Sequence, residues 1–402
     1  MKKYRVWAEV DLAALRRNVG VVRGRLAPGT RILAVIKADA YGHGAIPIAR
    51  ACLESGVDFL GVGDSTEAIE LRESGILAPI LILGAVIEEE IGWIVSYDIR
   101  PTLHSRDMVY LLDEEAHRQG KRLKVHLKID TGMGRLGASP ARALEVAARI
   151  QASPNLELEG LCTHFSSASG PDPAPTLEQL RTFESVCRRL TGMGVQAPIR
   201  HAASSGALAA LPSTHFNMVR PGIALYGIDP GNLAPSGLTV EPILSLKTQI
   251  TFLKGVRGET PVGYNRTHIT TRSTRIATLP VGYNDGYPYL LSNKAQCLVR
   301  GVPARVVGTV TMDYTTIDVG HIPQARVGDE VILIGRAGEH AVTVVDLARQ
   351  AGTIPYEIVC ALGRRVRRVY VDSGTAGPER EAGTVAGVEP AAVSLGSSRT
   401  SQ

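Results

Sequence analysis

Aromatic residues, cysteines and long apolar runs are all scarce in this chain of 402 residues. Aromatics make up 5% of the sequence, and 12 of them are tyrosines. The five cysteines are scattered without a CxxC pair or metal-ligand spacing, which argues against a disulfide framework or a metal site. No apolar run approaches a membrane span, and Glu9 and Asp11 interrupt any N-terminal signal peptide. We therefore predict a cytoplasmic protein with no membrane partner.

The charge is nearly balanced, with 44 basic and 39 acidic residues and a formal net charge of +5. The densest basic run is RRVRRV, residues 364–369. A nucleic-acid surface would need a larger basic cluster with aromatic or helix-reading context around it. We therefore expect no nucleic-acid partner, and we interpret the run as a solvated strand edge.

Short β-rich runs alternate with helical patterns over residues 11–234. Eight such strands predict a (β/α)8 barrel, with an open doubly wound sheet as the competing architecture. No GxGxxG follows the first strand, which weakens the dinucleotide-binding version of the open sheet. The predicted strands are 31–37, 57–62, 79–83, 99–103, 122–129, 156–163, 198–203 and 216–220, and the predicted helices include 45–55, 64–74, 105–119, 140–152 and 176–192.

The pattern changes in the last third of the chain. Over residues 235–372 helical periodicity vanishes and short β-runs with turn residues take over, which predicts a mainly β domain. We expect the strand-like segment at residues 1–10 to join this domain. Residues 373–402 are dominated by Gly, Ala, Ser, Pro and Glu, a composition typical of a disordered tail.

Polar side chains follow several of the predicted barrel strands, where the active residues of such barrels lie. A single residue of this kind is more often a loop anchor than a catalyst, but several together predict a site. The strand-end residues are Lys37 and Tyr41; Lys128, Asp130 and Arg135; His164; His201, Ser204 and Ser205; and Arg220, Gly222 and Ile223.

Lys37 closes an apolar run and precedes a glycine-rich turn, in the sequence RILAVIKADAYGHG. A buried lysine amine loses its proton more readily and can form an imine with an aldehyde or ketone. Either a substrate carbonyl or pyridoxal phosphate (PLP) could supply that group. The SSG and RPGI sequences after the last two strands predict a phosphate cradle around Ser205 and Gly222. These residues favour a phosphorylated ligand without selecting PLP.

Several motifs in order resemble the bacterial alanine racemases, from about residue 4 to residue 370. They are WAEVDLAALRRNV, AVIKADAYGHG, KIDTGMGRLG, MVRPGIALYG, LPVGYNDGY, TVTMDYTTIDV and IPYEIVCALGRRVRRVY. The resemblance implies a PLP-dependent racemase with an N-terminal barrel, a β domain and a homodimeric active site. It implies interconversion of L- and D-alanine, which supplies D-alanine for peptidoglycan.

The resemblance also assigns roles to individual residues. It implies that Lys37 binds PLP and that Arg220 hydrogen-bonds the pyridine nitrogen. His164 would lie beneath the ring and link Arg220 to Tyr264. Arg135 would reach the phenolic oxygen of PLP, steadied by Lys128, which is often carbamylated in this family. The phosphate would be held by Tyr41, Ser205, Gly222, Ile223 and Tyr356, and the partner subunit would supply Tyr264, Tyr283, Met312 and Asp313.

The implied mechanism has two bases, because racemisation removes the Cα proton on one face and returns one on the other. Lys37 would serve one face and Tyr264 of the partner subunit the other. Guanidinium only donates hydrogen bonds, so Arg220 would leave the pyridine nitrogen unprotonated. Related decarboxylases have a carboxylate there, so Arg220 favours racemisation. A non-catalytic PLP carrier would lack the β domain.

Several positions depart from the family pattern. Ser204 replaces an asparagine and Tyr314 a glutamine, while Ser169, Tyr289 and Thr309 replace charged residues of the substrate entrance. These losses leave the substrate range open. We predict alanine, because Tyr356 would crowd the side-chain pocket, with serine or a broader range as the alternative.

Overall fold

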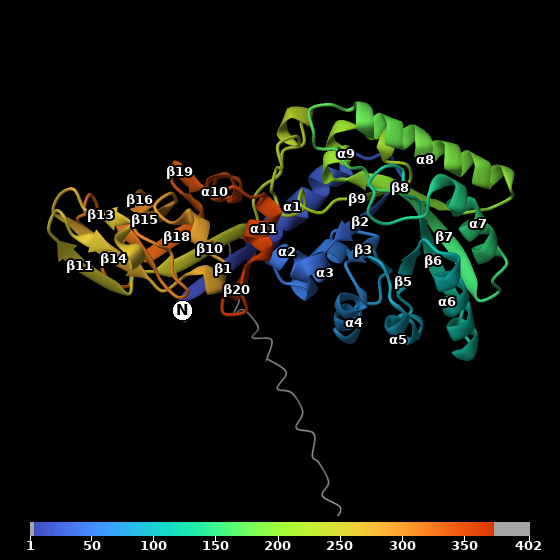
Figure 1. Cartoon of the computed structure of the whole chain (residues 1–402), viewed down its shortest axis with the longest axis horizontal. Coiled ribbons are helices and arrows are strands. Elements are labelled where there is room, and N and C mark those ends of the chain that lie inside the picture. Colours follow the sequence, from blue (N-terminus) through green and yellow to red (C-terminus); the bar gives the residue numbers. More distant parts are fainter. Residues whose placement is uncertain (1–3, 374–402) are drawn as a thin grey trace, which may run out of the picture.

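The computed structural model describes residues 4–373, which form a barrel and an elongated β domain (Figure 1). The predicted tail at 373–402 lies, apart from Ser373, outside the described residues. Eight parallel strands close the barrel, since β2 pairs with both β3 and β9. The prediction of a barrel is confirmed, and the open doubly wound sheet is excluded.

Each barrel strand lies within or overlaps a predicted strand, and helices cover the outside of the barrel (Figure 1). The strands are β2 (Arg31–Val35), β3 (Phe59–Val62), β4 (Ile80–Ile82), β5 (Arg100–Leu103), β6 (Leu123–Lys128), β7 (Leu156–Cys162), β8 (Ile199–Ser204) and β9 (Met218–Arg220). The helices are α1 (Leu12–Arg23), α2 (Lys37–Gly42), α3 (Ala45–Glu54), α4 (Ser65–Glu73), α5 (Ile91–Ser96), α6 (Arg106–Arg118), α7 (Pro140–Gln151), α8 (Ala174–Gly192) and α9 (Ser205–Ala210).

A ten-stranded sheet dominates the β domain, with β20 at one edge. The N-terminal strand β1 lies inside this sheet, antiparallel to β10 and parallel to β20. The strands are β1 (Val6–Asp11), β10 (Leu244–Gln249), β11 (Phe252–Val256), β12 (Pro261–Val262), β13 (His268–Ile269), β14 (Thr274–Leu279), β15 (Gln296–Val299), β16 (Val302–Val306), β17 (Thr315–Asp318), β18 (Glu330–Ala337), β19 (His340–Val342) and β20 (Arg367–Val371), of which β12 and β13 form a separate ribbon.

Two helices interrupt the β domain, α10 (Val344–Ala351) and α11 (Pro355–Cys360). The expectation that helical periodicity vanishes after residue 235 is wrong here. The Thr343 side chain caps α10 by accepting a hydrogen bond from the Asp346 amide, and Gly352 ends the helix in the left-handed conformation. The short α11 carries Tyr356 toward the barrel cavity.

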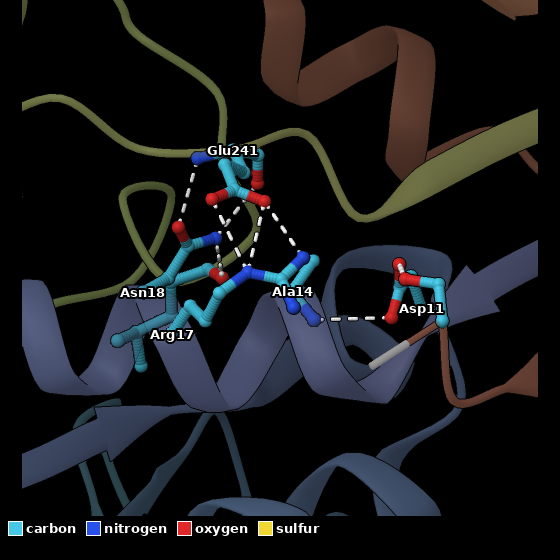
Figure 2. A network of polar contacts seen from close by, with 7 residues as sticks. Asp11, Ala14, Arg17, Asn18 and Glu241 are labelled. Atoms are coloured by element: carbon cyan, nitrogen blue, oxygen red, sulfur yellow. Dashed lines mark hydrogen bonds and ion pairs between the residues drawn. The ribbon is translucent and has the colours of Figure 1, made fainter. Parts of the chain in front are cut away.

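A polar network ties α1 to the segment that connects the two parts of the chain (Figure 2). The Asp11 carboxylate caps α1 by accepting from the Ala14 amide at 3.0 Å. Arg17 donates to the Glu241 carboxylate from Nη2 at 2.7 Å, and the Asn18 side chain exchanges two hydrogen bonds with the Glu241 backbone. The predicted boundary between residues 234 and 235 falls within this connection and stays a prediction.

No helix within residues 4–373 combines the length and the apolar character that crossing a bilayer requires.

Candidate active site

A cavity of about 920 Å³ opens at the carboxyl ends of the barrel strands. Its walls contain most of the strand-end residues predicted from the sequence, together with Tyr356 from α11. They are Lys37, Tyr41, Lys128, Arg135, His164, Ser204, Ser205, Arg220, Gly222 and Tyr356. Ile223 follows Gly222 but is buried and does not line the cavity. The fold therefore gathers these residues from distant parts of the sequence.

Lys37 begins a left-handed turn rather than an ordinary helix. Residues 38–41 all have φ between 52° and 55°, a conformation that is unfavourable for residues with a Cβ atom. Gly42 and Gly44 have positive φ and also lack room, because a Cβ there would collide with the Val359 carbonyl oxygen and the Tyr370 hydroxyl, respectively. The YGHG sequence is thus explained by close packing against α11 and β20.

The Lys37 side chain reaches the cavity but is itself exposed in the single chain. The expectation that Lys37 would be buried is therefore wrong for one chain alone. The lysine follows the carboxyl end of β2, where Ala38 and Asp39 are also exposed, whereas residues 40–43 of the turn are buried. The cavity wall near it is strongly cationic, with Lys128, Arg135 and Arg220.

Arg220 lines the cavity, is only 6% exposed and binds several neighbouring groups. Its Nη1 donates to His201 Nδ1 at 3.0 Å, and its Nη2 contacts His164 Nδ1 at 3.2 Å and the Thr163 carbonyl at 2.7 Å. Because a guanidinium only donates, both imidazoles accept from it at Nδ1. Burial, together with the Arg220 charge, lowers the pKa of His164 to about 3. Arg220 Nε has no acceptor among the described residues and remains available to a ligand.

A buried relay continues from Arg220 through the barrel core. His201 Nε2 lies 2.8 Å from His126 Nδ1, and His126 Nε2 lies 3.2 Å from Glu159 Oε2. Since His201 accepts at Nδ1, it donates from Nε2, and His126 donates in turn to Glu159. Burial opposes ionisation of Glu159, but the His126 hydrogen bond and the Arg100 charge lower its pKa to about 2. The relay fixes both tautomers and the orientation of Arg220.

His126, Glu159 and Arg100 were not predicted as site residues from the sequence. A signal was present, because His126 and Glu159 interrupt the apolar runs of β6 and β7. Polar residues in buried strands are satisfied by partners, and here each finds the other at the centre of the barrel.

The cavity wall after β8 and β9 offers hydroxyl donors. Ser205 Oγ accepts from the Gly222 amide at 3.0 Å and the Ala224 amide at 3.2 Å, so its own proton is available to an anion. The Tyr41 hydroxyl lies so close to Gly222 that a Cβ there would stand 2.6 Å from it. Burial raises the pKa of Tyr41, which keeps this phenol a donor. Hydroxyl donors beside a glycine turn fit a phosphate group.

Lys128 is 9% exposed, and its Nζ donates to the Leu83 carbonyl at 3.3 Å. Burial, with the nearby charges of Arg220 and Arg135, lowers the pKa of the Lys128 amine. A lysine of this kind has a larger unprotonated fraction at neutral pH.

The residues predicted to serve a partner subunit lie away from the cavity. Tyr264 begins the turn η4 (Tyr264–Arg266) between β12 and β13, and β13 lies at the end of the β domain remote from the barrel (Figure 1). It is 70% exposed, and Met312 is 53% exposed. Tyr283 is also exposed, and none of these residues lines the cavity of its own chain. Asp313 pairs with Arg365 Nη1 at 2.8 Å.

The interpretation of RRVRRV as a solvated strand edge is only partly right. The strand β20 does lie at the edge of the sheet. Arg365, however, pairs with Asp285 and Asp313, and the Arg368 side chain is only 14% exposed. Both arginines bind neighbouring segments of the chain, but Arg365 stays 48% exposed and only Arg368 is largely withdrawn from water.

The positions that depart from the family pattern are dispersed. Ser169 and Ser204 line the cavity, whereas Thr309 is buried and donates to the Tyr264 carbonyl at 3.1 Å. Tyr289 is exposed on the β domain and, like Thr309, does not line the cavity.

Comparisons with known proteins agree with this architecture. Models of the alanine racemase N-terminal and C-terminal domains match residues 10–230 and 243–370. An alanine racemase of Halothermothrix orenii is 42% identical over 364 residues, which are 90% of this chain and 96% of the relative.

Solved structures show the same likeness. The alanine racemase of Streptomyces lavendulae has a TM-score of 0.87 at 36% identity, over 92% of this chain and 98% of that one. That of Bartonella henselae, with covalently bound pyridoxal phosphate, has a TM-score of 0.82 at 27% identity, over 91% and 99%. The two domains, the cavity and these matches together show that the chain belongs to the alanine racemase family.

Proposed function

We propose that the chain works as a cytoplasmic homodimer that interconverts L- and D-alanine with PLP, and so supplies D-alanine for peptidoglycan. The observation that carries the proposal is the meeting of Lys37 and Arg220 in one cavity beside a cradle of hydroxyl donors. Five free cysteines fit the reducing interior of a cell.

In this proposal the residues of the cavity hold the cofactor. Lys37 would bind it covalently through its amine, and His164, which accepts from Arg220, would help to hold it. Arg135, steadied by a carbamylated Lys128, holds the phenolic oxygen. The phosphate is held by Tyr41, Ser205, Gly222, Ile223 and Tyr356. Support comes from the hydroxyls that remain free to donate around Gly222 and from the lowered pKa of Lys128, because carbamylation needs an unprotonated amine.

PLP, when bound, supplies an electron-withdrawing ring that stabilises negative charge at the substrate Cα. Arg220 tunes that property, because it donates to the ring nitrogen and has no proton-accepting atom. The relay through His201, His126 and Glu159 supports this role by holding Arg220 in place. A carboxylate at this position would instead favour a protonated nitrogen, as in the related decarboxylases.

Two groups exchange the Cα proton in this proposal, one on each face of the substrate. The Lys37 amine serves one face, and Tyr264 of the partner subunit serves the other, with the partner's Met312, Asp313 and Tyr283 around the substrate. Two observations support a shared site: the apolar and aromatic side chains exposed on the β domain, and the absence of Tyr264 from the cavity of its own chain.

A second candidate substrate is serine. Ser166, Ser167, Ser169 and Ser204 line the cavity, and hydroxyl groups can pair with a hydroxylated substrate. The loss of charged residues from the entrance is compatible with a broader range.

The test is to incubate the purified protein and PLP with single L-amino acids and to resolve the enantiomers by chiral chromatography. We expect D-alanine to form fastest. Faster formation of D-serine would move the assignment to a serine racemase. If PLP binds and no D-product forms from any substrate, the proposed racemase activity is wrong.

A further inference from the structure

Arg368 on β20 binds the turn that follows Lys37. Its Nε donates to the Gly42 carbonyl at 3.0 Å, and Nη2 lies 4.0 Å from the Asp39 carboxylate. Its other donors bind the carbonyls of the segment just before β20, those of Leu362, Gly363 and Val366, at 2.8 to 2.9 Å. One guanidinium thus joins the lysine turn of the barrel to the end of the β domain.

Tyr370, two residues further along β20, makes a second contact to the same turn. Its hydroxyl donates to the His43 carbonyl at 3.1 Å. The hydroxyl stands where a Cβ of residue 44 would be, so glycine is required there. The two side chains point the same way because they are two residues apart on one strand. Parallel pairing of β20 with β1 fixes that strand.

The barrel holds the other end of the turn with a carboxylate. Glu67 accepts from the Ala38 amide at 2.6 Å and from the Gly63 amide at 2.7 Å. At the start of α4 the Asp64 side chain caps the helix by accepting from the Glu67 amide, but Glu67 does not return a hydrogen bond to Asp64. The Glu67 side chain is directed to the lysine turn instead.

The turn needs such external support. Four consecutive non-glycine residues in the left-handed conformation are unfavourable and persist only where the surroundings fix them. Lys37 opens this turn, so the direction of its side chain depends on the same constraints. Without Arg368, the Gly42 carbonyl and Asp39 lose their cationic partner, and the turn is free to relax.

We propose that Arg368 and Tyr370 are positioning residues, which hold the left-handed turn from the β domain and so orient the Lys37 amine in the barrel cavity. The inference rests on the proposed function, because it takes Lys37 to be the residue that binds PLP. It gives the β domain a second role in the site of its own chain, beside Tyr356 in the cavity wall and apart from the residues that it would lend to a partner.

The experiment compares Arg368→Gln, Arg368→Lys and Tyr370→Phe with the parent protein. Arg367→Gln is the matched control, because Arg367 is an exposed neighbour on the same strand. Hydrogen–deuterium exchange of residues 38–44 in cofactor-free protein reports on the turn itself. Equilibrium titration gives the dissociation constant of PLP, and borohydride reduction with peptide mass spectrometry reports the attachment at Lys37.

For Arg368→Gln we expect at least tenfold faster exchange over residues 38–44, unchanged exchange in β6, and at least tenfold weaker PLP binding. Arg368→Lys and Tyr370→Phe should show smaller shifts in the same direction, and Arg367→Gln none. Parental exchange and PLP binding in both Arg368 variants and in Tyr370→Phe would overturn the inference, as would faster exchange spread evenly over the barrel. If the parent itself does not attach PLP at Lys37, the proposed function fails first.

Discussion

The barrel and the β domain present their site residues in opposite ways. In the barrel, Arg220 is buried and bound on several sides by imidazoles and carbonyls. On the β domain, Tyr264 and Met312 stand exposed without a cavity of their own. The first set of residues lines a cavity within one chain, whereas the second set is exposed and lines no cavity of its own chain. The difference is the main structural argument for a site shared between subunits.

The largest loss of activity is expected from removing Lys37, the residue that the barrel contributes for PLP attachment. In Lys37→Ala no amine remains at the turn for covalent attachment of PLP, so turnover should vanish from either enantiomer. Chiral assays in both directions and borohydride trapping of the cofactor would measure this. Residual racemisation at a parental pH profile would contradict the assignment of Lys37.

Removing the Tyr264 phenol should remove the contribution of the β domain to turnover and leave PLP binding in the barrel intact. Tyr264→Phe should retain PLP at Lys37 but lose about 10²- to 10⁴-fold in racemisation, since one face loses its acid–base group. Exchange of the Cα hydrogen with deuterium should then survive from one enantiomer only. Racemisation at the parental rate would show that Tyr264 is not the second base.

A fall in pH should destabilise the barrel more than the β domain, because buried histidines of the barrel have lowered pKa values. Burial lowers the pKa of His43 to about 4 and of His164 to about 3, and also lowers those of His126 and His201. The unfolded chain then binds protons that the native barrel does not, so barrel stability should fall as pH drops below about 6.5. Each group contributes up to about 1.4 kcal/mol per pH unit until its native pKa is reached.

Single-tryptophan variants allow this to be measured. Trp93 lies in α5 of the barrel and Trp7 in β1 of the β-domain sheet. Urea unfolding of Trp7→Phe and Trp93→Phe, followed by fluorescence from pH 7.5 to 5, should show a steeper loss for the barrel probe. Equal slopes for the two probes would contradict the prediction.

The smallest effect on activity is expected from a substitution at the substrate entrance. Ser169 lines the cavity where the family commonly has an acid. We expect Ser169→Asp to change the ratio of alanine to serine turnover by about tenfold or less, because it adds a charge without touching Lys37. Ser169→Asn is the uncharged control, and an effect equal in both variants would refute a role for charge.

Much of the barrel half could be predicted from the sequence. The apolar runs located the strands, and the polar residues after them, such as Lys37, His164 and Arg220, do line one cavity. His126 and Glu159 were recognisable as polar residues within buried strands, but their pairing could not be predicted, because strand register decides which buried polar groups meet. The left-handed turn could not be predicted either, because residues 38–41 are not glycines. The need for Gly42 and Gly44 arises from contacts with residues that are distant in the sequence.

The β-domain half depended more on resemblance than on local pattern. A tyrosine beside a glycine turn, such as Tyr264, is as compatible with packing as with catalysis, and its exposure appears only in the folded chain. The role of Arg368 was missed for a similar reason, because a run of arginines on an edge strand usually faces water. Its partner, Gly42, lies 326 residues away in the sequence.

The most direct test of a shared site is complementation between two inactive variants. Lys37→Ala and Tyr264→Phe, unfolded together and refolded as a mixture, should form hybrid dimers in which one of the two sites has both native residues. Random pairing of two equal pools predicts about a quarter of the parental activity, against no activity for Lys37→Ala and at most about a hundredth for Tyr264→Phe when each is refolded alone. If the mixture forms dimers and stays inactive, Lys37 and Tyr264 do not meet across a subunit interface.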